Sequence, residues 1–296
     1  MKKRYYLSLF VMLISCGTLV LRCTKADETP AVVDPLVIKL ATSATFGSFI
    51  TDKAGNTLYF FANDGNGANN CTGGCTTSWP NFNVTGLMQS QLSDGLLLAD
   101  FATISTLTGN QVTYKGWPLY YYAPSGIREN PGQTTGDGVG GVWFIAKPDY
   151  TIMLAKEQLL GVDTKSYVVS AANVYTEGVG TTTYMTDLAG RTLYSFYKDS
   201  TNINKFTKPD FSNNSVWPIY ETDKIVVPSI IDKSLFGSIT LYGKKQLTYK
   251  GWPMYYYGAD VDVSTGKFRG FNKGVFGPLP VKWPVLFKDI PPAPKK

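Results

Sequence analysis

The chain has 296 residues and no histidine, and its 28 lysines and arginines outnumber its 22 acidic residues. The missing histidine excludes histidine general bases, Ser-His and Cys-His nucleophile pairs, and histidine-ligated zinc, copper or haem. Three positive charges lie at residues 2–4, and without them the formal charge of +6 falls to +3, so the basic balance does not predict a nucleic-acid partner.

The N-terminus has the pattern of an export signal. Basic residues 2–4 precede an apolar run that is too short to span a bilayer. The tetrapeptide ending at Cys16, Leu-Ile-Ser-Cys, resembles a bacterial lipobox. We therefore predict a signal peptide over residues 1–15 and a lipid on Cys16. Residues 16–36, rich in charge and proline, are predicted to be the tether to the membrane.

Two alternatives for this segment stay open. One is an ordinary cleaved signal without lipid. The other is lipidation at Cys23, although Arg22 suits cleavage at that point poorly.

Short strand signals dominate the remainder of the chain. Regularly spaced strands separated by turn residues predict an all-β fold. Helical periodicity is limited to Met88–Leu98 and Ser229–Leu235, each of which could hold one short helix. The strands predicted for the first half are 48–51, 57–61, 111–114, 119–122, 142–145 and 151–154, and those for the second half are 182–186, 192–197, 246–249, 254–257 and 283–287.

One aromatic frame, apolar-Tyr-x-aromatic-x-x-Asp, occurs four times. The spacing of its leading tyrosines groups the copies into two pairs. Alternate strand residues share a face, so the frame is predicted to be mainly a structural strand-to-turn module whose aspartate caps the turn. The leading tyrosines are Tyr59, Tyr120, Tyr194 and Tyr255; the second aromatics include Phe61 and Phe196; the closing residues are Asp64, Ser125, Asp199 and Asp260; and the tryptophans that follow the copies are Trp79, Trp143, Trp217 and Trp283.

The two pairs of copies are related by duplication. Residues 51–59 match 186–194, and residues 111–118 match 246–253, at the same offset of 135 residues. This predicts two tandem homologous domains, each with an internal half-repeat. Their predicted bounds are 37–160 and 161–290, followed by a tail at 291–296. A four-bladed propeller-like closure of all four copies is the alternative architecture.

These motifs resemble the bacterial secreted-repeat lipoproteins, a family without an assigned biochemical function. The family pattern joins the tyrosine frame to a Cys-x-x-x-Cys, here Cys71 and Cys75, and to a Trp-Pro at Trp79. The resemblance is close over residues 45–147 and looser over 180–285. In the second half Phe206 and Asp210 occupy the cysteine positions. The resemblance implies a lipid-anchored protein of the bacterial cell envelope, at the outer membrane or cell surface.

The cysteine pair has one principal interpretation. Two cysteines four residues apart in a glycine-rich loop of an exported protein predict a small disulfide. A redox pair is the functional alternative. A metal site would need more ligands than two thiolates, so no metal and no cofactor are predicted.

Trp117 and Trp252 are the best candidates for ligand recognition. Each lies in a tight turn before a proline, where burial is difficult, so both are predicted to be exposed. The neighbouring aromatics Tyr120, Tyr122, Tyr255 and Tyr257 complete the candidate binding set.

The function favoured by these observations is a non-enzymatic binding or interaction module for an envelope glycan or protein. No Gly-x-Ser-x-Gly elbow occurs, and the Gly-x-Gly-x-x-Gly at 136–141 precedes a strand instead of a helix. A hydrolase that uses carboxylates alone stays open. The alternative from another class is a thiol-redox or electron-transfer accessory protein that uses Cys71 and Cys75.

Overall fold

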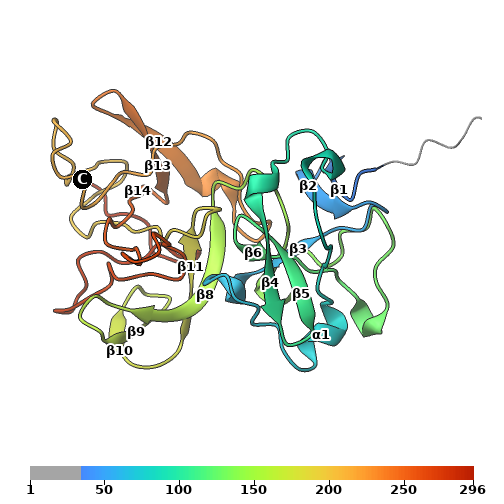
Figure 1. The fold of residues 1–296 in the computed structure, drawn as a ribbon. Helices are drawn as coiled ribbons and strands as arrows, with labels where there is room; N and C mark the ends of the chain where they lie inside the picture. Colours follow the sequence, from blue (N-terminus) through green and yellow to red (C-terminus); the bar gives the residue numbers. More distant parts are fainter. Residues whose placement is uncertain (1–34) are drawn as a thin grey trace, which may run out of the picture. The chain divides into compact units, whose positions relative to one another are not determined.

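Short antiparallel strands make up most of the regular structure in the computed structural model, which describes residues 35–296 (Figure 1). The prediction of an all-β fold is confirmed. Cys16 and the predicted signal and tether up to residue 34 lie outside the described residues. The strands are β1 (Ile38–Ser43), β2 (Gly47–Asp52), β3 (Tyr59–Phe61), β4 (Phe101–Thr106), β5 (Gly109–Tyr114), β6 (Trp117–Pro118), β7 (Trp143–Ile145), β8 (Met153–Leu160), β9 (Ser166–Val169), β10 (Tyr175–Glu177), β11 (Thr181–Thr186), β12 (Phe236–Leu241), β13 (Lys244–Tyr249) and β14 (Trp252–Pro253).

Helices in residues 35–296 are no longer than one turn. The α-helix α1 covers Cys75–Ser78. The others are three-residue 3₁₀ turns at Ala62–Asp64, Gln89–Gln91, Leu98–Asp100, Pro124–Gly126, Val139–Gly141 and Lys233–Leu235.

The strands form five small open sheets. The first half contains β1-β2, β3-β7 and β4-β5-β6, and the second contains β10-β9-β8-β11 and β12-β13-β14. Within residues 35–296 every sheet is open, and no sheet closes into a propeller. None of the helical segments in residues 35–296 has the length and the apolar character that a membrane span requires.

The sequence duplication is preserved in the backbone. Strands β4, β5 and β6 recur as β12, β13 and β14 with every bound shifted by the same 135 residues. Their pairing register is also the same, because Phe101 lies opposite Tyr114 and Phe236 lies opposite Tyr249. In each half the leading tyrosines of the two copies form an antiparallel bridge, Tyr59 with Tyr120 and Tyr194 with Tyr255.

The β1–β2 pair of the first half has its counterpart in β8–β11. Thr51 and Thr186 occupy equivalent positions in β2 and β11, and each bridges to a threonine six residues on. Strand β8, which the sequence assigns to the first domain, thus pairs with β11 of the second. Strands β9 and β10 fill the long connection between them. Residues 35–296 form one compact unit.

Several predicted elements differ from the structure. The segment Met88–Leu98, where one short helix could form, holds no α-helix: only the 3₁₀ turns Gln89–Gln91 and Leu98–Asp100 are helical. The backbone between them bonds to the edge of β1, because Ser93 N donates to Ile38 O at 3.1 Å. Ser229–Leu235 likewise contains only the turn at its end. The segments predicted as strands at 192–197 and 283–287 make isolated bridges only.

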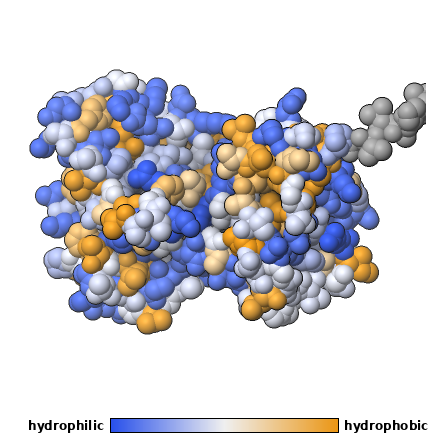
Figure 2. All heavy atoms as spheres, in the orientation of Figure 1, coloured by the Kyte–Doolittle hydropathy of each residue, from blue (hydrophilic) through white to orange (hydrophobic). Residues whose placement is uncertain are grey.

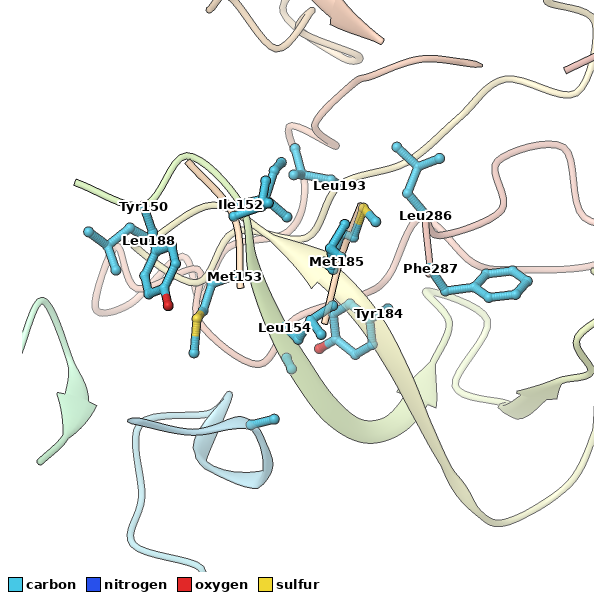
Figure 3. Close-up of a cluster of buried hydrophobic side chains, with 14 of the residues drawn as sticks. Tyr150, Ile152, Met153, Leu154, Tyr184, Met185, Leu188, Leu193, Leu286 and Phe287 are labelled. Atoms are coloured by element: carbon cyan, nitrogen blue, oxygen red, sulfur yellow. The ribbon is translucent and has the colours of Figure 1, made fainter. Parts of the chain in front are cut away.

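Buried apolar side chains around β8 and β11 form the core of the second half (Figure 3). Met153 and Leu154 of β8 pack with Tyr184 and Met185 of β11, and all are almost inaccessible to solvent. On the face drawn in Figure 2, apolar and polar side chains are interspersed. Large apolar side chains exposed elsewhere on these strands and loops include Leu107, Val179 and Val263.

Candidate functional site

The four copies of the tyrosine frame are joined by reciprocal hydrogen bonds. Each leading tyrosine donates its hydroxyl proton to a carboxylate supplied by the other copy of its half. Tyr120 donates to Asp64 Oδ2 at 2.6 Å, and its counterpart Tyr255 donates to Asp199 Oδ2 at 2.7 Å. In the other direction, Tyr194 donates to Asp260 Oδ2 at 2.5 Å. The tyrosine and the aspartate of one copy therefore do not bond to each other, and each bonds to a residue of the other copy.

The departure at Ser125 is compensated four residues along the chain. Tyr59 donates to the Glu129 carboxylate, which takes the place that Asp260 has in the second half. Glu129 is buried as well. The second copy of the frame thus lacks the aspartate, and Glu129 supplies a carboxylate in its place.

The second oxygen of each carboxylate holds a loop. Asp64 Oδ1 accepts from Asn70 N at 2.8 Å, and Asp199 Oδ1 accepts from Lys205 N at 2.7 Å. Glu129 Oε2 accepts from Thr135 N at 2.8 Å. In these three copies the amide lies six residues beyond the acid. The predicted turn-capping role therefore extends over a longer loop, and the carboxylate ties that loop to a buried tyrosine.

Burial governs the titration of the three aspartates in these ties. It raises the pKa of Asp64 to about 7 and the pKa of Asp199 and Asp260 to about 6, against hydrogen bonds from tyrosine and backbone that lower them. Burial also raises the pKa of the partner tyrosines, so the phenols keep their protons. These groups are already saturated with hydrogen bonds and act as structural ties.

A stack of four aromatic rings lies beside each set of ties. In the first half Phe61, Trp143, Trp79 and Tyr122 follow one another with centroid separations of 3.9, 3.7 and 4.5 Å. The second half repeats this order with Phe196, Trp283, Trp217 and Tyr257 at 4.6, 3.7 and 4.3 Å. The two tryptophans at the centre of each stack are buried, whereas the terminal tyrosine is half-buried. The frame therefore builds one aromatic column in each half.

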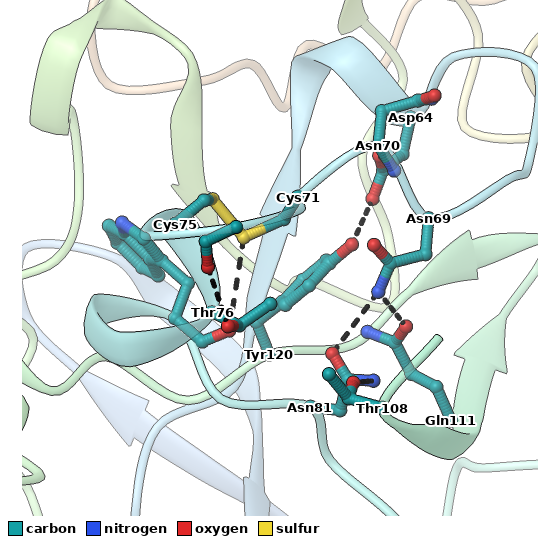
Figure 4. Close-up of a disulfide and its surroundings, with 12 residues drawn as sticks. Asp64, Asn69, Asn70, Cys71, Cys75, Thr76, Asn81, Thr108, Gln111 and Tyr120 are labelled. Carbon is teal, nitrogen blue, oxygen red and sulfur yellow. Dashed lines mark hydrogen bonds between the residues drawn. A yellow bond between two sulfur atoms is a disulfide. The ribbon is translucent and has the colours of Figure 1, made fainter. Parts of the chain in front are cut away.

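The two halves differ where the cysteines occur. Cys71 and Cys75 form a disulfide with an S–S distance of 1.99 Å, as their spacing predicts (Figure 4). Cys71 is buried against the aromatic column, and Cys75 is half-buried at the start of α1. In the second half the ring of Phe206 fills this space, 4.7 Å from Trp283.

We expect the disulfide to contribute little to stability. Replacing both cysteines by alanine should lower the free energy of unfolding by only about 2 kcal/mol, because the sequence separation is 4 and so short a loop restricts the unfolded chain weakly. Urea denaturation of the variant measures the change. Wild-type protein unfolded in reductant should give the same loss, and a variant that fails to fold would contradict the prediction.

A polar network supports the loop that carries Cys71 (Figure 4). Asn69 Nδ2 donates to Gln111 Oε1 at 2.6 Å and to Asn81 Oδ1 at 3.1 Å. Asn81 in turn donates to Thr106 and Thr108, both at 3.0 Å. The network fixes the disulfide loop against the tip of the β4–β5 hairpin.

Between this loop and the hairpin tip lies an open groove of about 490 Å³. Its polar side chains are hydroxyls and amides, and Leu107 at its rim is 92% exposed. No charged side chain lines it. The lining residues are Gly67, Ala68, Asn69, Cys71, Thr72, Gly73, Thr76 and Ile104 to Thr108. This is the candidate ligand site of the first half.

The predicted binding tryptophans are not exposed. Trp117 has no solvent-accessible surface and its Nε1 donates to Leu188 O at 2.7 Å; Trp252 is also buried and donates to Pro291 O at 2.8 Å. The prediction of exposed aromatics is therefore wrong. The turn itself is made by Lys115 and Gly116, so that each tryptophan begins the returning strand and points inward.

The remaining members of the predicted binding set divide into two groups. Tyr120 and Tyr255 are fully buried in the carboxylate ties. Tyr122 and Tyr257 are half-buried at the ends of the aromatic columns, and their role in binding stays a prediction. None of the six lines the groove beside the disulfide.

Sequence reasoning missed the amides that shape this groove. Asn69 and Gln111 have exact counterparts in Asn204 and Gln246, which make the same contact at 2.8 Å. Both residues recur at the 135-residue offset, and this recurrence could have identified them from the sequence. Among residues 35–296 no group of three or more Cys, Asp or Glu side chains is placed to hold a metal ion.

Comparison with known proteins bears on the same part of the chain. Residues 41–82 and 102–147 match a family model described as a secreted repeat of unknown function. These two segments of the first half are therefore similar to a secreted repeat of this family. The matched segments contain the tyrosine ties, the disulfide and the groove of this repeat, and they confirm the resemblance drawn from the motifs. As a secreted repeat, the protein is extracellular or belongs to the cell envelope. No curated protein and no solved structure matches the chain.

Proposed function

We propose that this secreted-repeat protein is a non-enzymatic binding module of the bacterial envelope, and that the groove beside Cys71–Cys75 takes a neutral glycan. The observation that carries the proposal is the chemistry of the groove. Thr72, Thr76, Thr106 and Thr108 line it with hydroxyls, and no charged side chain takes part. The hydroxyls of Thr76 and Thr106 donate their protons to backbone carbonyls, so their oxygens are available to a ligand as acceptors. Hydroxyls and amides exchange hydrogen bonds with sugar hydroxyls, while Leu107 offers an apolar contact.

The rigidity of the groove supports this assignment. Its floor is held by the disulfide, and its hairpin wall is held by the bonds of Asn81 to Thr106 and Thr108. A preformed site loses less conformational entropy when it binds a flexible oligosaccharide. The carboxylates of the tyrosine ties contribute to structure and leave no paired acids in the groove, which supports a non-enzymatic role.

The test is binding of neutral envelope oligosaccharides, measured by isothermal titration calorimetry beside acidic ones. Thr108→Arg should abolish binding because the arginine fills the groove rim. Thr103→Arg, at an exposed position of β4 that does not line this groove, is the matched control and should bind as wild type does. Unchanged binding in Thr108→Arg, preference for acidic sugars, absence of any binding, or cleavage of a bound sugar would each overturn the proposal.

Membrane attachment through a lipid on Cys16 is part of the same proposal. Substitution of Cys16 by serine should release the protein into the soluble fraction, whereas Cys23→Ser should leave it at the membrane. The opposite pattern would place the lipid on Cys23.

The thiol-redox alternative is favoured by one observation, the partial exposure of Cys75 at its disulfide. Counting thiols before and after mild reductant separates the two functions. A pair that is fully oxidised and slowly reduced supports a structural disulfide, and rapid, reversible reduction supports a redox role.

A further inference from the structure

A second groove, of about 470 Å³, lies between the β1–β2 turn and residues 225–233. It shares no lining residue with the groove beside the disulfide. Apolar walls come from Phe46, Val226, Val227, Pro228 and Ile231. Unlike the first groove, it is lined by charged side chains, namely Lys147, Lys233 and Asp149.

The floor of this groove is held by backbone hydrogen bonds. Thr151 N and Ile152 N both donate to Val226 O, at 2.9 and 3.1 Å. Val226 N donates to the Thr151 hydroxyl at 3.0 Å. The lining segment 225–228 is therefore fixed to the start of β8, and the groove is preformed.

Lys147 is a buried cation that forms no direct ion pair within residues 35–296. The side chain is 9% exposed, and it makes no hydrogen bond or ion pair with any residue of the described part of the chain. Its ammonium nitrogen lies 5.3 Å from the centre of the Tyr150 ring and 5.8 Å from that of Phe46. Burial lowers the pKa of this lysine, which reflects the cost of an ammonium with too few partners.

The nearby carboxylates are already engaged. Asp137 Oδ1 accepts from Ile145 N at 2.9 Å, and Asp149 Oδ2 is paired with Lys224 at 2.9 Å. Both carboxylates attract the Lys147 ammonium without forming an ion pair with it, and Lys233 repels it. Among the lining residues, two lysines face one carboxylate, Asp149, which is already paired with Lys224, so the lining has an excess of positive charge.

We propose that this groove binds an organic anion, a carboxylate or phosphate group on an apolar body, with Lys147 and Lys233 holding the anionic group and Phe46 and Ile231 contacting the apolar part. The hydroxyls of Thr45, Ser48 and Ser229 also line the groove and supply uncharged donors to the anion. A bound anion supplies the partner that the buried ammonium lacks.

The experiment compares four hexyl compounds on the full-length protein by isothermal titration calorimetry: hexanoate, hexyl phosphate, hexanol and hexylammonium. The two anions should bind at least about tenfold more tightly than hexanol, as expected for a charge-assisted hydrogen bond, and hexylammonium should not bind. The stronger of the two anions distinguishes a carboxylate from a phosphate ligand. Equal binding of hexanoate and hexanol, or no binding of either anion, would overturn the proposal.

Two lysine variants and a control locate the site. Lys147→Gln and Lys233→Gln should each weaken anion binding about tenfold or more, while Lys165→Gln, which removes an exposed lysine paired with Glu177, should leave it unchanged. Lys233 is exposed, so its variant tests the groove even if Lys147→Gln is unstable. Anion binding that persists in both variants would refute the site. Thr108→Arg should leave anion binding intact, which separates this proposal from the glycan groove.

Discussion

Replacing Trp143 by alanine is expected to lower the free energy of unfolding by about 3–5 kcal/mol. Trp143 is 4% exposed and lies inside the aromatic column, with ring centres of Trp79 at 3.7 Å and Phe61 at 3.9 Å. It also meets the edge of Tyr120, at 5.1 Å. Removal of the indole leaves a cavity bounded by rigid rings that cannot collapse into it. Urea denaturation followed by tryptophan fluorescence and circular dichroism measures the change.

Two further variants control this experiment. Trp283→Ala removes the equivalent ring of the second half and should cost a similar amount, because Trp283 lies 3.7 Å from Trp217. Tyr242→Ala removes an aromatic ring that is 52% exposed and should change stability by less than about 1 kcal/mol. A loss at Trp143 as small as that at Tyr242 would contradict the role assigned to the column.

The repeat frame could be recognised from the sequence, but the partners of its residues could not. Strand alternation predicts correctly that Tyr59 and Phe61 share one face. The partner of Tyr120 is Asp64, 56 residues away, and only the pairing of whole copies brings them together. Reasoning from one copy alone predicts that the aspartate caps the turn of its own copy. The spacing of residues in the sequence does not show which two copies of the frame pair with each other.

Ser125 illustrates the same limit. In the sequence it is a departure from the frame. In the structure Glu129 supplies the missing carboxylate from four residues further on, and the buried tyrosine is still satisfied. A buried tyrosine hydroxyl without a hydrogen-bond partner lowers the stability of the fold, so a partner is required. That requirement does not determine which residue of the loop supplies the partner.

The burial of Trp117 has a similar cause. The turn pattern correctly places Gly116 at positive φ and predicts a returning strand. The indole is buried because Leu188, in the other half of the chain, accepts its proton, and because the Arg269 guanidinium covers its ring at 4.4 Å. Both contacts come from segments distant in sequence, so a rule based on one turn predicts exposure.

Asp64→Asn is expected to change the pH dependence of stability. Burial raises the pKa of Asp64 in the folded protein from its ordinary value of 3.8 to about 7, so the folded protein binds an additional proton between these values. A raised pKa contributes stability that is fully present below about pH 4 and is lost as the pH rises through about 7. Asparagine does not titrate. The variant should therefore become more stable relative to wild type as the pH rises from 4 to 8.

The relevant quantity is the difference in unfolding free energy between wild type and Asp64→Asn, determined by urea denaturation at each pH. Taking this difference removes the contributions of Asp199 and Asp260, which titrate in both proteins. A pKa increase of this size corresponds to a relative change of the order of 4 kcal/mol across the range.

Asp210→Asn is the control, because Asp210 is exposed and its pKa is lowered, so this substitution should give a constant difference between pH 5 and 8. A difference that stays flat for Asp64→Asn, or that moves in favour of wild type, would show that Asp64 is ionised in its tie to Tyr120. The tie would then be an ordinary charge-assisted hydrogen bond, and the burial of the Asp64 carboxylate would not lower the free energy of unfolding at neutral pH.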